Sequence, residues 1–245
     1  MSNISSGHSQ ELGTTPATAS TRPNQLARPG WPEIIVGLVV LGAVTIATVL
    51  IAGQLGLGPV VFGLILTALA GVGGIAGFAA AVLLRIRSWS VFGVRRTTRR
   101  WLLIGVGAGV VAFVLKALAI QVWILITGDS TSPQGVYGDG GSGGVLSLIL
   151  ATLFLSLLTP LGEELLFRGV ITNALLRYGP LIGIVGSTLI FALAHGINIV
   201  FPAALVMGLV GAELLRRSGS VWPGVVAHAV VNLPTVPALV LAGAA

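Results

Sequence analysis

The chain has 245 residues, of which 55% are hydrophobic and only 8% are charged, and its formal net charge is +6. Soluble domains carry about a quarter charged residues, so this composition is typical of an integral membrane protein. The chain contains no cysteine, which excludes disulfide bonds, thiolate metal sites and a cysteine nucleophile. The basic residues lie mostly at the ends of apolar runs, where they set orientation in a bilayer, so no nucleic-acid partner is expected.

Residues 1–32 are rich in Ser, Thr, Pro, Asn and Gly and are predicted to form a disordered cytoplasmic tail. Four apolar runs of spanning length follow, at about 33–53, 59–84, 101–127 and 145–168. Three later runs, at about 181–195, 202–215 and 221–241, are interrupted by Gly, Pro or His. The first two of these three are short, so they are expected to stop within the membrane or to line a cavity.

These runs predict an all-α fold, namely a polytopic membrane helix bundle with about seven transmembrane helices, in a range of about six to eight. Two of these helices are expected to be short. We divide the chain into the tail 1–32, the N-terminal transmembrane helices and loops of 33–144, and a C-terminal helix bundle of 145–245 that carries the polar motifs. Oligomeric state has no signature in the sequence.

The arginines predict the orientation of the chain. With the N-terminus inside, every arginine falls on the inner side of the membrane and the outer loops hold none. The chain is therefore expected to be a multi-pass protein of the plasma membrane with a cytoplasmic N-terminus. The inner arginines are Arg22, Arg28, Arg85, Arg87, Arg95, Arg96, Arg99, Arg100, Arg168, Arg177, Arg216 and Arg217.

Lys116 is the one basic residue that this pattern leaves inside a predicted span, the third. One interpretation is that it pairs with backbone carbonyls or extends outward to the interface, and the other is that it has a role in an internal cavity.

Glycines add two further expectations. The Gly73/Gly77 pair, with Gly37 and Gly42, favours close helix packing, and the glycine-rich stretch 138–144 is expected to be a flexible outer connector.

The stretch 159–169 places two adjacent carboxylates and an arginine in an otherwise apolar region. An ionisable group at membrane depth marks a functional site or a tight pair. Glu164 and Arg168 are four residues apart with the acid first, which is the favourable order for a helical ion pair. Glu163 points about 100° away around the helix and has no counter-ion nearby in the sequence. Glu164 is therefore expected to be structural, and Glu163 is free for chemistry.

Two histidines follow in the C-terminal runs, and His228 shares a helix face with Asn232 four residues later. Glu163 lies 16 residues before Gly179 in the predicted turn, and His195 lies 16 residues after it. An antiparallel hairpin therefore places both at a depth of ~24 Å from the turn. Measured from the next turn on the same side, His228 is only ~12 Å deep and Asn232 ~18 Å deep.

This polar set is suited to hydrolysis. Glu163 can act as a general base with help from His195, while His228 and Asn232 can donate N–H groups to the oxyanion of a tetrahedral intermediate. Glu163, His195 and His228 are also a plausible set of zinc ligands, and that alternative stays open. A serine nucleophile elbow and a His-Glu-x-x-His zinc helix are both absent from the sequence.

Glu-Glu-x-x-x-Arg at 163–168, Phe-x-x-x-His at 191–195 and His-x-x-x-Asn at 228–232 together resemble the CPBP family. This family includes the type 2 CAAX prenyl proteases and the bacteriocin-processing and self-immunity proteins, and the resemblance covers about residues 146–241. It implies an intramembrane endopeptidase acting on a membrane-associated substrate of the CAAX type, with or without a prenyl group. Glu163 and His195 would activate water, His228 and Asn232 would form the oxyanion site, and Glu164 and Arg168 would hold the scaffold.

The family has been described as metalloproteases, but the spread in depth of the candidate ligands favours a mechanism without metal, so no cofactor is expected and zinc is the alternative. The expected partners are the lipid bilayer and a peptide or protein substrate. Two other functions use the same residues. A non-catalytic peptide-binding immunity or scaffold protein would share the cavity, whereas a transporter would be expected to show paired halves, which the sequence lacks.

Overall fold

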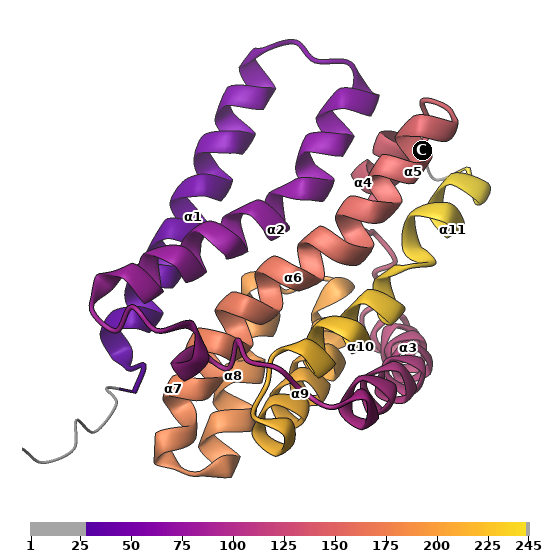
Figure 1. Ribbon diagram of the computed structural model, residues 1–245. Coiled ribbons are helices and arrows are strands. Elements are labelled where there is room, and N and C mark those ends of the chain that lie inside the picture. The colour runs from indigo at the N-terminus through magenta and orange to yellow at the C-terminus, as the bar shows by residue number, and fades with distance from the viewer. Residues whose placement is uncertain (1–27, 244–245) are drawn as a thin grey trace, which may run out of the picture.

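The computed structural model describes residues 28–243, and throughout that range its regular elements are helical, which confirms the predicted all-α fold (Figure 1). The predicted tail lies almost entirely outside the described residues. The N-terminal helices are α1 (Trp31–Gln54), α2 (Pro59–Leu84), η1 (Trp89–Phe92), α3 (Arg99–Thr127) and α4 (Gly135–Gly141). The helices that follow are α5 (Val145–Leu153), η2 (Phe154–Leu158), α6 (Thr159–Glu163), η3 (Glu164–Thr172), α7 (Asn173–Leu175), η4 (Leu176–Tyr178), α8 (Pro180–Ala194), α9 (Val200–Ser218), α10 (Trp222–Asn232) and α11 (Thr235–Leu241).

Five helical segments of the described chain are long and apolar enough to cross a membrane: α1, α2, α3, the run Val145–Tyr178 and the run Trp222–Leu241. The predicted count of seven is not confirmed, because α8 has only 15 residues and α9 does not meet the criterion for a span. These are the two segments that the sequence marks as short. Both line the internal cavity described below, as expected for helices that end within the bundle.

The run Val145–Tyr178 is the central helix of the bundle, and it extends ten residues beyond the predicted end at 168. It is not a uniform α-helix, because the π-helical segments η2 and η3 flank the short α6. A π-helical turn contains more residues than an α-helical turn, so it rotates the side chains that follow around the helix axis. Such segments are frequent at functional sites. The junction between α6 and η3 falls between Glu163 and Glu164.

The hairpin of α1 and α2 packs on this central helix through glycines (Figure 1). A Cβ atom on Gly74 would lie 2.5 Å from the Gly162 carbonyl oxygen, so α2 and α6 meet backbone against backbone. Gly77 likewise lies against the Gly37 carbonyl, which confirms the close packing expected from these glycines. Gly42 has no such neighbour and instead lines the cavity. This close approach fixes the part of the central helix that carries Glu163.

The glycine-rich stretch 138–144 is not the flexible connector that its composition predicts. Residues Gly135–Gly141 form α4, and three of its glycines, Gly138, Gly140 and Gly141, are buried. A Cβ on Gly63 of α2 would lie 2.4 Å from the Gly140 backbone nitrogen. The small residues therefore allow a short helix to pack directly on α2 rather than providing flexibility.

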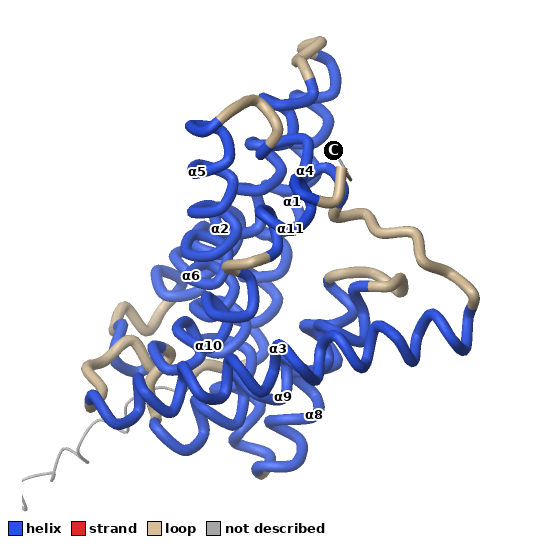
Figure 2. The backbone as a smooth tube through the Cα atoms, turned by 90° about the vertical axis from the view of Figure 1, so that its right-hand side faces the viewer, coloured by secondary structure: helices blue, strands red, loops and turns tan. Residues whose placement is uncertain are grey.

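α3 crosses the bundle beside α10, and its C-terminal end projects away from the other helices (Figure 2). The loop after α3 then returns to α4, which lies beside α5 and α11. Gly105 and Gly109 bring the first half of α3 against the Pro223 and Ala227 carbonyls of α10. The cavity therefore has one wall from a helix that belongs to the N-terminal half of the chain.

An ion pair that the sequence analysis missed joins the first turn of α1 to the residue after α2. Glu33 is fully buried, and its carboxylate accepts hydrogen bonds from Arg85 at 2.5 and 2.9 Å and from the Gly30 backbone nitrogen at 2.8 Å. The hydrogen bond to Glu33 raises the pKa of the Arg85 guanidinium. Arg85 therefore links the two helices of the α1–α2 hairpin.

Candidate active site

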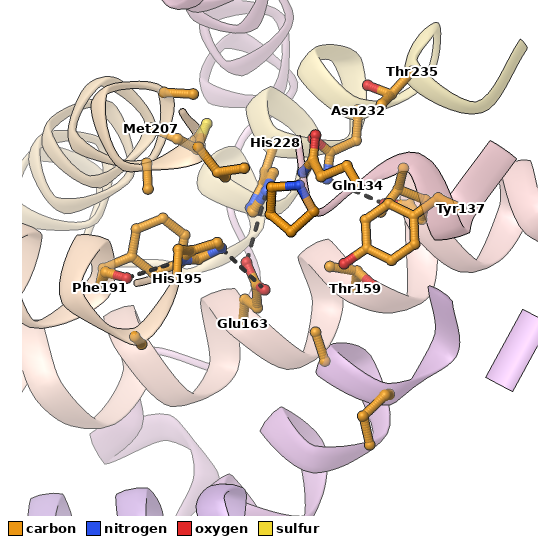
Figure 3. Close-up of a pocket in the computed structure, with 18 of the residues that line it drawn as sticks. Gln134, Tyr137, Thr159, Glu163, Phe191, His195, Met207, His228, Asn232 and Thr235 are labelled. Carbon is orange, nitrogen blue, oxygen red and sulfur yellow. Dashed lines mark hydrogen bonds and ion pairs between the residues drawn. The ribbon is translucent and has the colours of Figure 1, made fainter. Parts of the chain in front are cut away.

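A cavity of about 650 Å³ lies between the helices and receives side chains from both halves of the chain (Figure 3). Its walls are mainly apolar, and α1 and α2 contribute almost only aliphatic groups. All four residues predicted to act in catalysis line it. The polar side chains in the lining are those of Thr45, Lys116, Ser132, Gln134, Tyr137, Thr159, Glu163, His195, His228, Asn232 and Thr235.

The two adjacent glutamates face different surroundings, as their helical spacing predicts. Glu163 ends α6, is 6% exposed and points into the cavity, where its Oε2 atom has no hydrogen-bond partner. Glu164 is fully buried and points toward α10. A buried carboxylate oxygen without a partner is costly unless it serves function, so Glu163 is the group in this site available for chemistry.

His195 meets Glu163 across the hairpin, which confirms the prediction from equal distances to the turn. It follows the last residue of α8, and its Nε2 atom lies 3.8 Å from Glu163 Oε1. Its Nδ1 atom lies 2.8 Å from the Phe191 carbonyl oxygen. Because a carbonyl only accepts hydrogen bonds, this contact places the hydrogen on Nδ1 and leaves Nε2 as an acceptor in the neutral ring.

His228 also reaches Glu163, so the predicted depth difference of ~12 Å is wrong. Its Nε2 atom lies 3.8 Å from Glu163 Oε2, and its Nδ1 atom lies 3.2 Å from Glu164 Oε1. The depth calculation assumed that the helices are parallel and start at the same level. That assumption does not hold for α10, which packs against α3. Glu163 therefore lies between two imidazoles, with one nitrogen facing each carboxylate oxygen (Figure 3).

Asn232 lines the same cavity one helical turn beyond His228. Its Nδ2 atom donates a hydrogen bond to the Leu155 carbonyl oxygen at 3.2 Å. An amide nitrogen carries two hydrogens, so this bond orients the side chain and leaves one hydrogen for another acceptor. Leu155 belongs to the π-helical segment η2, which thus helps to position a predicted site residue.

Glu164 and Arg168 form the predicted ion pair, with 3.1 Å between Arg168 Nε and Glu164 Oε2. Both are buried, and Arg168 also donates to the Met207 carbonyl oxygen at 2.8 Å and stacks 4.2 Å from the Phe191 ring centroid. The pair does more than hold the scaffold, because Glu164 also contacts His228. The sequence analysis missed this link between the structural pair and the site.

Tyr137 is a site residue that the sequence analysis overlooked. It comes from α4, lines the cavity and is directed toward Thr159 and Glu163 (Figure 3). Burial, with a smaller contribution from the Glu163 charge, raises the pKa of Tyr137 to about 12, so its hydroxyl stays a neutral donor. Its position as one of only two tyrosines, next to the glycine-rich stretch, was the signal available in the sequence.

No metal centre is assigned among the described residues. In the range 28–243, no three His, Cys, Asp or Glu side chains form a group that could hold a metal ion. Glu163 faces the Nε2 atom of each histidine at 3.8 Å, through a different oxygen each time. The Nδ1 atoms of the two histidines contact the Phe191 carbonyl and Glu164, an outer-shell arrangement that would also suit zinc-bound imidazoles.

The family model of the type II CAAX prenyl endopeptidase Rce1-like proteins matches residues 145–234. The matched segment runs from the start of α5 to the residue after Leu233 and contains Glu163, Glu164, Arg168 and the other motif residues His195, His228 and Asn232. Searches of curated proteins and of solved structures found no match. The resemblance read from the motifs is confirmed by this match, in which residues 145–234 are similar to the Rce1-like type II CAAX prenyl endopeptidases.

Proposed function

We propose that this protein is an intramembrane endopeptidase that hydrolyses a peptide bond of a membrane-associated, CAAX-type substrate with water activated by Glu163 and His195. The family match implies a protease, and the mechanism is our proposal. The observation that carries it is the buried Glu163 carboxylate, facing an imidazole nitrogen on either side within a mostly apolar cavity. A water molecule between Glu163 and His195 can donate one hydrogen to each.

In the first step, the water oxygen attacks the carbonyl carbon of the peptide bond while Glu163 accepts its proton. His195 is fixed by its Nδ1 hydrogen bond to Phe191, so its Nε2 lone pair is oriented to hold the other water hydrogen. General-base assistance of this kind contributes about 10²–10⁴-fold to rate. The low polarity of the cavity strengthens these interactions, because little solvent competes for them.

The tetrahedral intermediate places a negative charge on the former carbonyl oxygen, and His228 and Asn232 are the proposed donors to it. The Nδ1 atom of His228 contacts Glu164, whereas its Nε2 atom lies 3.8 Å from Glu163 Oε2, beyond hydrogen-bond distance, and in this proposal its N–H points at the oxyanion. Asn232 bonds to Leu155 through one N–H of its amide, and in this proposal the second N–H donates to the oxyanion. When the C–N bond breaks, Glu163 returns the proton to the leaving amine, and the products are a carboxylic acid and an amine.

The cavity lining supports an amphipathic substrate. Residues such as Leu38, Leu41 and Leu66 of α1 and α2 form an apolar side of the cavity, opposite the polar set on the C-terminal helices. A membrane-associated chain with an apolar modification, such as a prenylated cysteine, suits such a cavity because its apolar group stays out of water. We propose that the substrate belongs to this class.

Hydrolysis can be tested directly with the purified protein in liposomes and a fluorescence-quenched farnesylated peptide ending in Cys-Val-Ile-Met. We expect cleavage after the modified cysteine, identified by product masses, and we expect it to persist in excess chelator because the proposed mechanism activates water with Glu163 and His195 alone. Peptide binding without cleavage would instead favour a non-catalytic immunity or scaffold protein. Activity lost in chelator and restored only by a divalent metal would make Glu163, His195 and His228 zinc ligands.

We further propose that the N-terminus and the loop after α2 face the cytoplasm, on the basis of the arginine distribution. The chain has no native cysteine, so single cysteines at Ser88 and Ser142 give a clean readout with a membrane-impermeant maleimide. Ser142→Cys should react in intact cells, whereas Ser88→Cys should react only after permeabilisation. Labelling of both positions in intact cells would contradict this orientation.

A further inference from the structure

Lys116 is the only lysine in the chain, and it lines the cavity that contains Glu163. It belongs to α3, outside the segment matched by the family model. It lies 17 residues after Arg99 at the start of α3, which corresponds to ~25 Å along the helix. A charged group at such depth is costly and calls for a partner or a function.

The contacts of Lys116 are few. Its Nζ atom lies 3.3 Å from the Val231 carbonyl oxygen and 5.3 Å from the Phe113 ring centroid. Among the described residues, no carboxylate lies within ion-pair distance of it, in contrast to the buried Arg168, which pairs with Glu164. An ammonium group has three hydrogens, so one backbone carbonyl leaves part of its donor capacity and its whole charge uncompensated. Of the two alternatives left open by the sequence, the carbonyl contact is confirmed, and Lys116 also lies in the cavity lining, where the other alternative gives it a role.

The packing of α3 on α10 places this ammonium close to the proposed oxyanion site. Gly105 and Gly109 lie against Pro223 and Ala227, and Lys116 continues the same face to Val231. Val231 follows His228 by three residues, a rise of ~4.5 Å, and Asn232 is the next residue. Nζ is therefore on the order of 5–10 Å from the reacting centre, a span of about two or three extended residues.

We propose that Lys116 binds a carboxylate of the substrate two or three residues from the scissile bond. This inference rests on the proposed function, since it concerns how a substrate is held in the same site. A single ammonium at this depth suits one carboxylate, whereas lipid headgroups stay at the membrane surface and phosphate sites gather several donors. The carboxylate can come from the C-terminus of a substrate chain or from an Asp or Glu side chain.

The test measures binding and cleavage separately. Binding uses Glu163→Gln protein, so that no substrate is consumed, with the farnesylated Cys-Val-Ile-Met peptide as free acid and as C-terminal amide. The free acid should bind at least about tenfold more tightly, as expected for a charge-assisted contact. Adding Lys116→Met should remove this preference, while adding Lys116→Arg should preserve most of it. Gln121→Met, an exposed position on the same helix, is the matched control and should leave the preference intact.

A third peptide identifies the source of the carboxylate. This peptide is amidated at the C-terminus and carries Glu in place of Met, so its only carboxylate is on a side chain. If the protein binds it more tightly than the plain amide, and Lys116→Met removes that preference, the carboxylate site is supported and a side chain can occupy it. Equal binding of acid and amide peptides by protein with native Lys116, or a preference that survives Lys116→Met, would overturn the proposal. If wild-type protein cleaves the peptides but binds acid and amide equally, the Lys116 proposal fails and the protease function stands. If the protein shows a Lys116-dependent preference for the acid but no cleavage, the protease function fails and the carboxylate site stands.

Discussion

Replacing Glu163 with Gln should lower peptide hydrolysis by about 10²–10⁴-fold, because the general base of the proposed reaction is lost. Glutamine has nearly the same size and shape, but its amide cannot accept the proton of the attacking water. The Glu163 Oε2 atom has no hydrogen-bond partner, and the carboxylate lies no closer than 3.8 Å to either imidazole nitrogen, so its replacement should change stability little. The rate of cleavage of the farnesylated peptide, measured beside a folding assay, tests this expectation.

Glu213→Gln is the matched control for the change of charge. Glu213 lies on α9, outside the cavity lining, and pairs with Arg216 at 2.7 Å and with Arg217. This variant should cleave the peptide at the wild-type rate. If Glu163→Gln retained more than about a tenth of wild-type activity with an unchanged pH profile, Glu163 would not be the base, and His195 would be the remaining candidate for that role.

The meeting of Glu163 and His195 was predictable because it depends on one local feature, the turn before Pro180. Two helices that leave a short turn in opposite directions stay level over their length, and equal spacing from Gly179 was enough to place the two side chains together. The separation of Glu163 from Glu164 was likewise a matter of helical geometry within one segment. The all-α fold and the short α8 follow from the lengths of the apolar runs, whereas α9, with 19 residues, is longer than its apolar run 202–215 predicts.

The position of His228 was not predictable in the same way, because it depends on how α10 packs on α3 and on the central helix. Close contacts at Gly105 and Gly109 set that packing, and hydrophobic periodicity does not reveal which helix a glycine will face. The same limit applies to α4, whose glycines predict a flexible connector in isolation but pack on α2 in the bundle. Tyr137 and Lys116 line the cavity because of these non-local contacts of α4 and α3. The π-helical segments rotate the side chains that follow them, and no residue pattern in the sequence marks their positions.

Replacing Glu164 with Gln should destabilise the protein by roughly 3–5 kcal/mol, because it leaves the Arg168 charge unpaired in the interior. Arg168 is 1% exposed and lies against Gly211 of α9, so its guanidinium has no room to reach water. The remaining contacts, with the Met207 carbonyl and the Phe191 ring, do not neutralise the charge. Unfolding of the detergent-solubilised protein, followed by loss of helical signal with increasing denaturing detergent, measures the effect.

Glu163→Gln is the control for this experiment, because it makes the same chemical change at the adjacent residue, whose only pairs are the 3.8 Å contacts with two histidines, and it should leave the unfolding midpoint nearly unchanged. The double variant Glu164→Gln/Arg168→Met removes both charges, so it should recover a large part of the stability lost in Glu164→Gln. Activity should not recover in the double variant, because His228 would still lack the carboxylate that holds its Nδ1 atom. A double variant no more stable than Glu164→Gln would show that the cost comes from the lost His228 contact rather than from the unpaired Arg168 charge.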